Sequence, residues 1–247
     1  MKKDLKSYER HNKDYVLDQD TYYSKEAVIK RTEDSNMFKS SGFELAFTLS
    51  KKLPETHIDI GSGVGWLTRK TAPLFKHVIG IEPSTAAVSA AKKVNDDCTN
   101  VSFVNKDMVD GLVSLNLSEP VFVTTGAVLS HIEDYYVEEF LKRINDMPIG
   151  SNLFFSENYD KNMHWKFWHI RNKDWWRKNL PNWQLIFLDL ENSGYASGIF
   201  GLRLHPEDLI KTKQYTLLEK TSWKLNFFIN LFVRFAKKIK NYLLFKK

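Results

Sequence analysis

A short strand that runs directly into three closely spaced glycines is the feature that most restricts the fold. Residues 57–65 read His-Ile-Asp-Ile-Gly-Ser-Gly-Val-Gly, with glycine at every second position from Gly61. Glycine is needed where a backbone turns sharply or lets a ligand approach it closely. The segment therefore predicts a buried strand followed by a ligand-binding loop, as in α/β proteins.

The chain after Pro54 repeats a pattern of strand, loop and helix. A strand that runs into the glycine loop covers 56–65, a second strand with its turn covers 77–84, and further strand patterns cover 101–107, 121–132 and 151–158. Helical patterns cover 66–75, 85–94 and 134–144. Residues 183–208 look like two strands joined by an Asn-Ser-Gly turn, which predicts a hairpin. We therefore expect an α/β fold with a doubly wound, mostly parallel seven-stranded sheet and a C-terminal antiparallel hairpin.

The loop differs from two other glycine-rich loops that bind nucleotides. A dinucleotide-binding loop carries a glycine at its sixth position, which counted from Gly61 is Trp66 here. A P-loop ends in Gly-Lys-Ser/Thr, and none follows. The sequence therefore disfavours a dinucleotide site and an ATPase-type phosphate site.

Three acids stand where ligands bind in open α/β sheets. Asp59 lies inside the first strand, where a carboxylate needs a partner such as a cationic ligand or loop amides. Glu82 follows the second strand, 21 residues after Gly61, and can accept the hydroxyls of a ribose. Asp107 follows the third strand and can accept from an adenine amino group. Successive parallel strands end at one edge of the sheet, so we expect one site.

At these residues the chain resembles the class I S-adenosylmethionine-dependent methyltransferases, over about residues 55–205. The resemblance implies that the glycine loop and Asp59 hold the methionine end of S-adenosylmethionine, Glu82 the ribose, and Asp107 with Met108 the adenine. The end of the fourth strand would pass near the sulfonium. The implied cofactor contacts are Asp59, Gly61, Ser62, Gly63, Gly65, Glu82, Pro83, Asp107, Met108, Thr125 and Gly126.

The segment after the fourth strand departs from one branch of that family. It reads Thr-Thr-Gly-Ala from Thr124, in place of the Asn/Asp-Pro-Pro-Tyr/Phe box of enzymes that methylate amino groups of nucleobases. This argues against DNA or RNA bases as the acceptor.

Two residues are candidates for the chemistry. His131 follows the fourth strand and could act as a general base, or it could pack or cap the following helix. Glu157 ends the fifth strand and could bind an acceptor, or it could be a solvated strand end.

His164 and His169 have no evident third and fourth ligand, so we expect no metal. The single cysteine, Cys98, excludes an intrachain disulfide, favours a reducing compartment and is expected to be an ordinary residue.

The 247 residues suit one domain with additions at both ends. We expect an N-terminal helical arm or cap over 1–53, a methyltransferase domain over 54–219 and a basic amphipathic tail over 220–247. Residues 160–183 form an aromatic insertion with five of the seven tryptophans. It could cover the sheet edge, close over substrate as a lid, or touch a membrane interface.

The net charge of +6 comes from the tail, since 220–247 holds eight basic residues and no acid. This distribution indicates a local patch and argues against a nucleic-acid-binding protein. Residues 223–247 have the pattern of a basic amphipathic helix, which suits an anionic membrane surface. The alternatives are packing on the domain, a homodimer contact or, less favoured, an RNA-binding tail. No leader or spanning segment is evident, so we expect a cytoplasmic protein, peripheral at the inner face of a membrane if the tail binds lipid.

We therefore expect a methyltransferase that acts on a hydroxyl of a glycan, lipid-linked sugar or other small acceptor near a membrane surface. One alternative is a cytosolic small-molecule methyltransferase whose tail dimerises. The other is a non-catalytic cofactor-binding module that tethers a partner complex.

Overall fold

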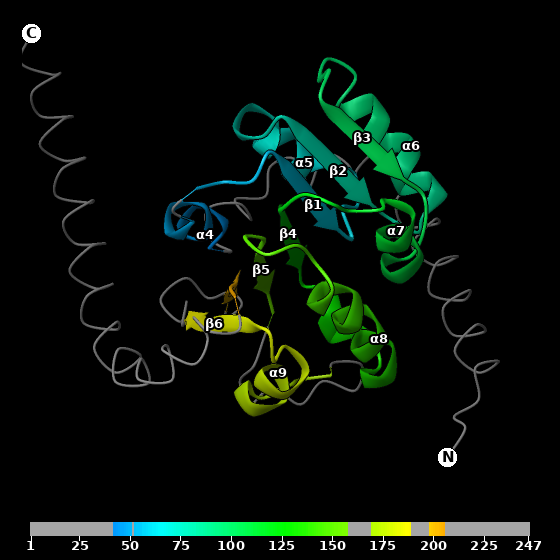
Figure 1. Cartoon of the computed structure of the whole chain (residues 1–247). Coiled ribbons are helices and arrows are strands. Elements are labelled where there is room, and N and C mark those ends of the chain that lie inside the picture. The colour runs from blue at the N-terminus through cyan, green and yellow to red at the C-terminus, as the bar shows by residue number, and fades with distance from the viewer. Residues whose placement is uncertain (1–41, 51, 158–168, 189–197, 206–247) are drawn as a thin grey trace, which may run out of the picture. The chain divides into compact units, whose positions relative to one another are not determined.

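The computed structural model describes residues 42–50, 52–157, 169–188 and 198–205, which contain one seven-stranded sheet with helices packed on its two faces (Figure 1). The order in the sheet is β3-β2-β1-β4-β5-β7-β6. The first five strands pair in parallel, whereas β7 pairs antiparallel with both β5 and β6. This confirms the predicted fold class. The strands are β1 (Thr56–Ile60), β2 (His77–Ile81), β3 (Val101–Val104), β4 (Val121–Gly126), β5 (Asn152–Ser156), β6 (Trp183–Leu188) and β7 (Gly198–Arg203).

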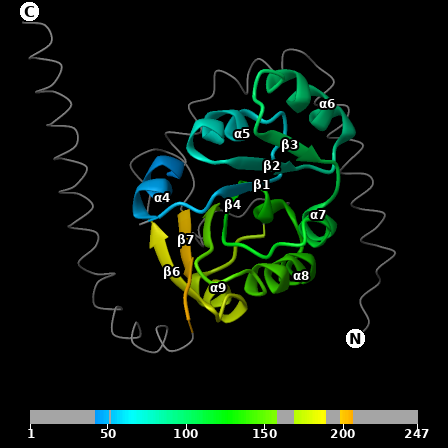
Figure 2. The ribbon, with the colours of Figure 1, turned by 45° about the horizontal axis from the view of Figure 1, so that its top comes forward.

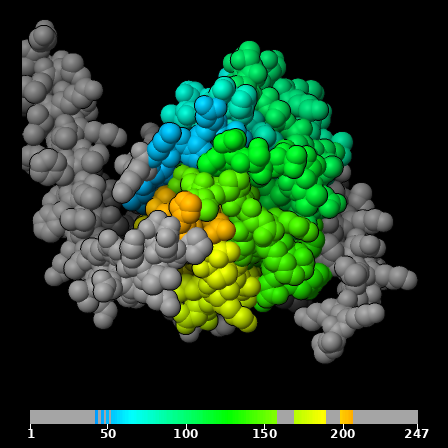
Figure 3. Space-filling model, in the orientation of Figure 1, coloured from blue at the N-terminus to red at the C-terminus, as the bar shows by residue number. Residues whose placement is uncertain are grey.

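The helices cover the sheet in two groups, with α4 and α5 on one side and α7, α8 and α9 on the other (Figure 2). Alternation along β1 sends Ile58 and Ile60 into the core under the second group, and His57 and Asp59 to the opposite face. In the space-filling view α9 lies against α8 (Figure 3). The helices are α4 (Phe43–Leu49), α5 (Trp66–Thr71), η1 (Ala72–Leu74), α6 (Thr85–Val94), α7 (Met108–Ser114), η2 (Leu129–His131), α8 (Asp134–Asn145) and α9 (Lys173–Asn179).

Helix α7 is an element that the sequence pattern did not predict. Its seven residues include Gly111 and show no clear helical period. The helix forms because Asp107 caps it, with the side chain accepting from the amides of Val109 and Asp110. Gly111 allows close packing, since a Cβ there would lie 2.5 Å from Cγ2 of Ile81.

Strand β4 is shorter than predicted. We expected a strand over 121–132, but it ends at Gly126, and Ala127 takes the left-handed region at φ 55°. The single 3-10 turn η2 follows. The extended pattern fails here because the amides of residues 128–130 donate to the side chain of Glu157, directly after β5, and not to a neighbouring strand.

The remaining predicted elements are only partly described. The antiparallel pairing of the hairpin is confirmed from Trp183↔Arg203 to Leu188↔Gly198, although its predicted turn lies outside the described residues. Within the predicted insertion, α9 is helical and is capped by Asn172, while 158–168 lie outside. Only α4 and its neighbours are described in the predicted arm, and the tail 220–247 lies outside the described part. The chain divides into two compact units, 1–204 and 205–247. None of the described helices has the length and apolar character required to cross a membrane.

Candidate cofactor and acceptor site

The glycine loop is a tight turn that is bonded to the neighbouring strand. The φ angles of Gly61, Gly63 and Gly65 are +68°, +52° and +77°, all in the region that favours glycine. The amides of Gly61 and Ser62 both donate to the carbonyl of Ile81, at 2.8 and 3.2 Å. A Cβ on Gly61 would lie 2.4 Å from Cγ2 of Val128. The loop therefore lies in contact with the segment that follows β4.

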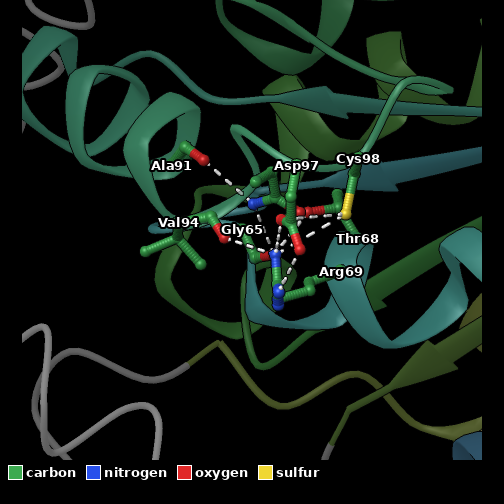
Figure 4. Close-up of polar contacts among 8 residues, drawn as sticks. Gly65, Thr68, Arg69, Ala91, Val94, Asp97 and Cys98 are labelled. Carbon is green, nitrogen blue, oxygen red and sulfur yellow. Dashed lines mark hydrogen bonds and ion pairs between the residues drawn. The ribbon is translucent and has the colours of Figure 1, made fainter.

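The far end of the loop is anchored to α6 by a cluster of polar side chains (Figure 4). The side-chain amide of Asn95 donates from Nδ2 to the carbonyl of Gly65 at 3.2 Å. Nearby, Arg69 pairs with Asp97 and lies 3.6 Å from the sulfur of Cys98. Burial and neighbouring acids raise the pKa of the Cys98 thiol, so it is a weak nucleophile in a structural cluster.

Asp59 is a buried carboxyl with one unsatisfied oxygen. Its Oδ1 accepts from the hydroxyl of Thr124 at 3.2 Å, but its Oδ2 has no hydrogen-bond partner within the described residues. Burial raises the pKa of Asp59 to about 7, the Thr124 hydroxyl lowers it, and the charge of Glu82 raises it further. The hydroxyl of Ser62 is also buried without a partner in that part of the chain. Such atoms are costly unless a ligand supplies the missing bonds.

Glu82 is brought to the glycine loop, as the sequence predicted. Its Oε2 accepts from the amide of Gly63 and its Oε1 from the amide of Ser84, both at 3.0 Å. Contact of this carboxylate with the hydroxyls of a ribose stays a prediction. The side-chain amide of Asn105 donates from Nδ2 to the backbone carbonyls of Glu82 and Pro83, at 3.0 and 2.9 Å. These two bonds hold the turn after β2 in place.

Asp107 and Met108 lie at the start of α7, one strand further along the edge. Both cap bonds of Asp107, from the amides of Val109 and Asp110, go to Oδ1. Met108 is buried in the core cluster that includes Ile81 and Leu112. Contact of Asp107 and Met108 with adenine stays a prediction.

The turn after β4 is held by two charged residues from other elements. Glu157 accepts from the amides of Val128 and Leu129 through Oε1, at 3.0 and 2.9 Å, and from the amide of Ser130 through Oε2 at 3.0 Å. Arg171 donates from Nη1 to the carbonyl of Leu129 at 2.7 Å. We call this arrangement, with Glu157 on the amides and Arg171 on the carbonyls of residues 128–132, the turn clamp.

The turn clamp corrects the prediction for Glu157. The side chain is 2% exposed, so it is not a solvated strand end. The hydroxyl of Thr125 also donates to Oε1, at 3.2 Å, so both oxygens are engaged within the protein. Glu157 therefore positions this turn, and its predicted catalytic role stays a prediction. Burial raises its pKa, while the amides and the Thr125 hydroxyl act in the opposite direction.

His131 is the last residue of η2 and is half-buried beside the clamped turn. Burial lowers its pKa, and the nearby His169 lowers it further, so the imidazole is neutral at pH 7. The backbone amide of His169 donates to the carbonyl of Ser130 at 2.7 Å, while its side chain is exposed. Strand β4 ends at Gly126, and the clamped turn follows it. The described residues contain no group of three or more side chains that could hold a metal, and His164 lies outside them.

Sequence reasoning missed three residues of this site: His57, Thr124 and Arg171. His57 carried a weak signal, because a histidine in a buried strand lies on the same face as Asp59 two residues later. Thr124 lies opposite Asp59 in the register of β4 with β1, which no local pattern reveals. Arg171 stands in an aromatic segment whose packing is not evident from sequence.

The strand order, the glycine loop and the acids at the carboxyl edge define the fold of class I S-adenosylmethionine-dependent methyltransferases. Residues 58–147 match a family model described as a methyltransferase domain. Residues 58–147 are thus similar to a methyltransferase domain, and the fold is that of the class I S-adenosylmethionine-dependent methyltransferases, of which solved examples hold S-adenosylmethionine or S-adenosyl-L-homocysteine.

Two solved structures illustrate the fold. The N-methyltransferase NodS from Bradyrhizobium japonicum, in complex with S-adenosyl-L-homocysteine, has a TM-score of 0.59 and 15% identity, covering 77% of this chain and 97% of that one. Magnesium protoporphyrin IX methyltransferase from Synechocystis, with bound S-adenosylmethionine, has a TM-score of 0.51 and 18% identity, covering 70% and 78%. Among curated proteins, phosphoethanolamine N-methyltransferase of Triticum aestivum is 19% identical over 152 residues, covering 61% of this chain. The present chain spans 28% of the length of that relative.

The residues present fit this cofactor. The unsatisfied Oδ2 of Asp59 suits a cationic group such as the ammonium of the methionine end. The glycine loop lets a ligand approach the backbone closely, and the carboxylate of Glu82 lies beside that loop. The structure thus places Asp59, near the end of β1, and Glu82, directly after β2, beside the glycine loop. The individual cofactor contacts stay predictions.

Proposed function

We propose that the chain transfers the methyl group of S-adenosylmethionine to a hydroxyl of a small acceptor, such as a glycan or lipid-linked sugar near a membrane surface. The observation that carries this proposal is the half-buried His131 on the clamped turn after β4. Val128 of the same turn packs against Gly61 of the cofactor loop. An acceptor at this turn would therefore lie beside the cofactor.

The chemistry requires positioning and a base. The cofactor supplies an activated methyl group, and alignment of the two reactants can contribute roughly 7–11 kcal/mol at best. A hydroxyl must lose its proton on methylation, and a well-placed base contributes about 10²–10⁴-fold. His131 is neutral at pH 7 because burial lowers its pKa, so it can accept that proton.

An amine acceptor is the second candidate, favoured by the relatives. The wheat relative and NodS are both named as N-methyltransferases. A neutral amine also loses a proton when it is methylated, so His131 could act as the base for either acceptor. The two further alternatives are a dimeric cytosolic small-molecule enzyme and a non-catalytic cofactor-binding module.

Release of S-adenosylhomocysteine from S-adenosylmethionine tests the activity directly. Full-length protein would be incubated with alkyl glycosides and, separately, with phosphoethanolamine. Release with the glycosides supports the hydroxyl acceptor, and release with phosphoethanolamine alone supports the amine. Tight cofactor binding without turnover on either acceptor panel would favour the binding module.

Paired histidine variants test the base. His131→Gln should lower kcat/KM by about 10²–10⁴-fold. His169→Gln is the matched control, since that side chain is exposed on the same segment of surface. It should retain most of the activity. Equal activity of the two variants would remove His131 as the base.

The membrane part of the proposal rests on the sequence of the tail. Residues 220–247 hold eight basic residues and no acid, on a pattern that suits anionic lipid. The protein should pellet with vesicles of phosphatidylglycerol and phosphatidylcholine, and less with phosphatidylcholine alone. Replacing Arg234, Lys237, Lys238 and Lys240 by glutamine should reduce the pelleting. Unchanged pelleting with a shift from dimer to monomer would support the dimerising tail instead.

A further inference from the structure

Four buried polar side chains form a continuous hydrogen-bonded chain that ends at Asp59. The hydroxyl of Thr71 on α5 lies 2.9 Å from Nδ1 of His57, and Nε2 of His57 lies 2.8 Å from the hydroxyl of Thr124. The hydroxyl of Thr124 lies 3.2 Å from Oδ1 of Asp59. All four residues are buried. We call them the polar chain.

His57 is enclosed by aromatic rings, which keep it neutral. Phe75 stacks on the imidazole at a centroid distance of 5.0 Å, and Phe47 and Phe122 meet it edge-on at 6.1 Å each. Burial lowers the pKa of His57 to about 3. A neutral imidazole has one donor nitrogen and one acceptor nitrogen, so its two neighbours must play opposite roles.

The hydrogen bonds of the polar chain can run in either of two directions, and the protonation state of Asp59 selects between them. When Asp59 is ionised, the Thr124 hydroxyl donates to Oδ1, so Thr124 must accept from His57 Nε2–H, and Nδ1 must accept from Thr71. When Asp59 carries a proton on Oδ1, every bond reverses. Thr124 then donates to Nε2, and Nδ1–H donates to Thr71, whose hydroxyl donates to the carbonyls of Leu67 and Thr68, at 2.9 and 3.1 Å.

We propose that the polar chain reverses when the cofactor binds, with His57 changing from the Nδ1–H to the Nε2–H tautomer and one proton leaving Asp59 for the solvent. The cationic amino group of the methionine end requires the ionised carboxylate, which only one direction of the chain supports. His57 and Thr124 are then positioning residues for cofactor binding. The inference rests on the cofactor site and is independent of the acceptor.

Burial and the groups around Asp59 hold the pKa of its carboxyl near neutral pH. From β1, His57 is neutral, and from β4, Thr124 lowers the pKa of Asp59. After β2, the charge of Glu82 raises it, in addition to burial. A pKa of about 7 in the cofactor-free protein means that binding releases a proton below pH 7 and releases almost none at pH 8.5.

Nitrogen NMR of His57 in the cofactor-free, full-length protein is the first test. The imidazole should carry its hydrogen on Nδ1 at pH 5.5 and on Nε2 at pH 8.5. Thr124→Ser keeps the hydroxyl and should show the same change. Thr124→Val removes the link and should abolish it. A single tautomer across this pH range in the wild type would overturn the proposal, whether or not the protein binds any cofactor.

Calorimetry with S-adenosylhomocysteine, which has the same amino acid end, is the second test. Titrations in two buffers of different ionisation enthalpy count the protons released. The wild type should release most of one proton at pH 6 and nearly none at pH 8.5, and Thr124→Val should move this release to higher pH. Binding without proton release at pH 6 overturns the inference but leaves the proposed function standing. An absence of binding counts against the cofactor site itself.

Discussion

Glu157 and Arg171 hold the same turn from opposite sides. The carboxylate of Glu157 accepts three consecutive backbone amides, from Val128 to Ser130, while the guanidinium of Arg171 donates to carbonyls of the same turn, those of Leu129 and Ile132. Both side chains are almost completely buried. Because the turn carries His131 and contacts the glycine loop, the two charges hold His131 in position relative to that loop.

The first prediction concerns the amide contacts of Glu157. In Glu157→Gln one carboxylate oxygen becomes an NH₂ group, which faces a backbone donor and cannot accept from it. The free energy of unfolding should fall by about 1–3 kcal/mol, measured by urea denaturation. Methyl transfer should fall more than the affinity for S-adenosylhomocysteine. The control is Glu119→Gln, at an exposed position, and equal stability of the two variants would contradict the turn clamp.

The second prediction is that Glu157 and Arg171 are energetically coupled. Arg171→Met leaves the carbonyls of Leu129 and Ile132 without their donor and removes the positive charge near the buried Glu157, which should cost about 3–5 kcal/mol. The Glu157→Gln and Arg171→Met double variant should be more stable than the sum of the two losses predicts, by about 1 kcal/mol or more. A double-mutant cycle of unfolding free energies measures this coupling. Additive losses would show that the two residues act independently.

The third prediction concerns the backbone of the cofactor loop. Gly65 has φ +77°, and a Cβ there would lie 2.6 Å from Nδ2 of Asn95 and 2.8 Å from the ring of Phe103. Gly65→Ala should therefore lose about 2 kcal/mol or more of stability and weaken cofactor binding. Gly126→Ala is the matched control, since among the described residues its Cβ would meet only Phe43, at 3.7 Å. A thermal melt in which both variants match the wild type would contradict this account.

The fourth prediction is that Asp59→Asn stabilises the cofactor-free protein at alkaline pH. Burial raises the pKa of Asp59 from 3.8 to about 7, so the folded protein holds a proton that the unfolded chain releases between these values. The stability of the wild type should therefore fall as the pH rises through this window. The variant lacks this loss and should be more stable at pH 8 by about 2–4 kcal/mol, while it loses cofactor affinity.

Denaturation midpoints at pH 4.5 and pH 8 measure the effect. The exposed Asp96→Asn is the control and should keep the pH dependence of the wild type. A smaller difference between Asp59→Asn and wild type at pH 8 than at pH 4.5 would contradict the prediction.

Much of the fold could be predicted because the signals are local. The parallel strands are continuous runs of apolar and β-branched residues, and α6 is an alanine-rich segment with Ser84 as its cap. The acids at the carboxyl edge follow from the topology, since parallel strands end together. Helix α7 was missed because seven residues around Gly111 carry no helical period, and its cap Asp107 was interpreted only as a ligand contact.

The roles at the turn after β4 could not be predicted in the same way. The segment 121–132 has the composition of a strand, and its end at Gly126 depends on Glu157, which lies more than 25 residues away in the chain. The clamp also needs Arg171, from a segment whose aromatic composition left open cover for the sheet edge, a substrate lid or contact with a membrane interface.

The sequence by itself determined the order of strands and helices, the glycine loop and the acids that meet there, because each depends on side-chain periodicity or on backbone freedom within a few residues. Only the tertiary structure decided that Glu157 positions a turn, that Arg171 opposes it, and that His57 and Thr124 link Asp59 to α5. These roles depend on hydrogen bonds between residues that are distant in the chain, and such bonds leave no local pattern in the sequence.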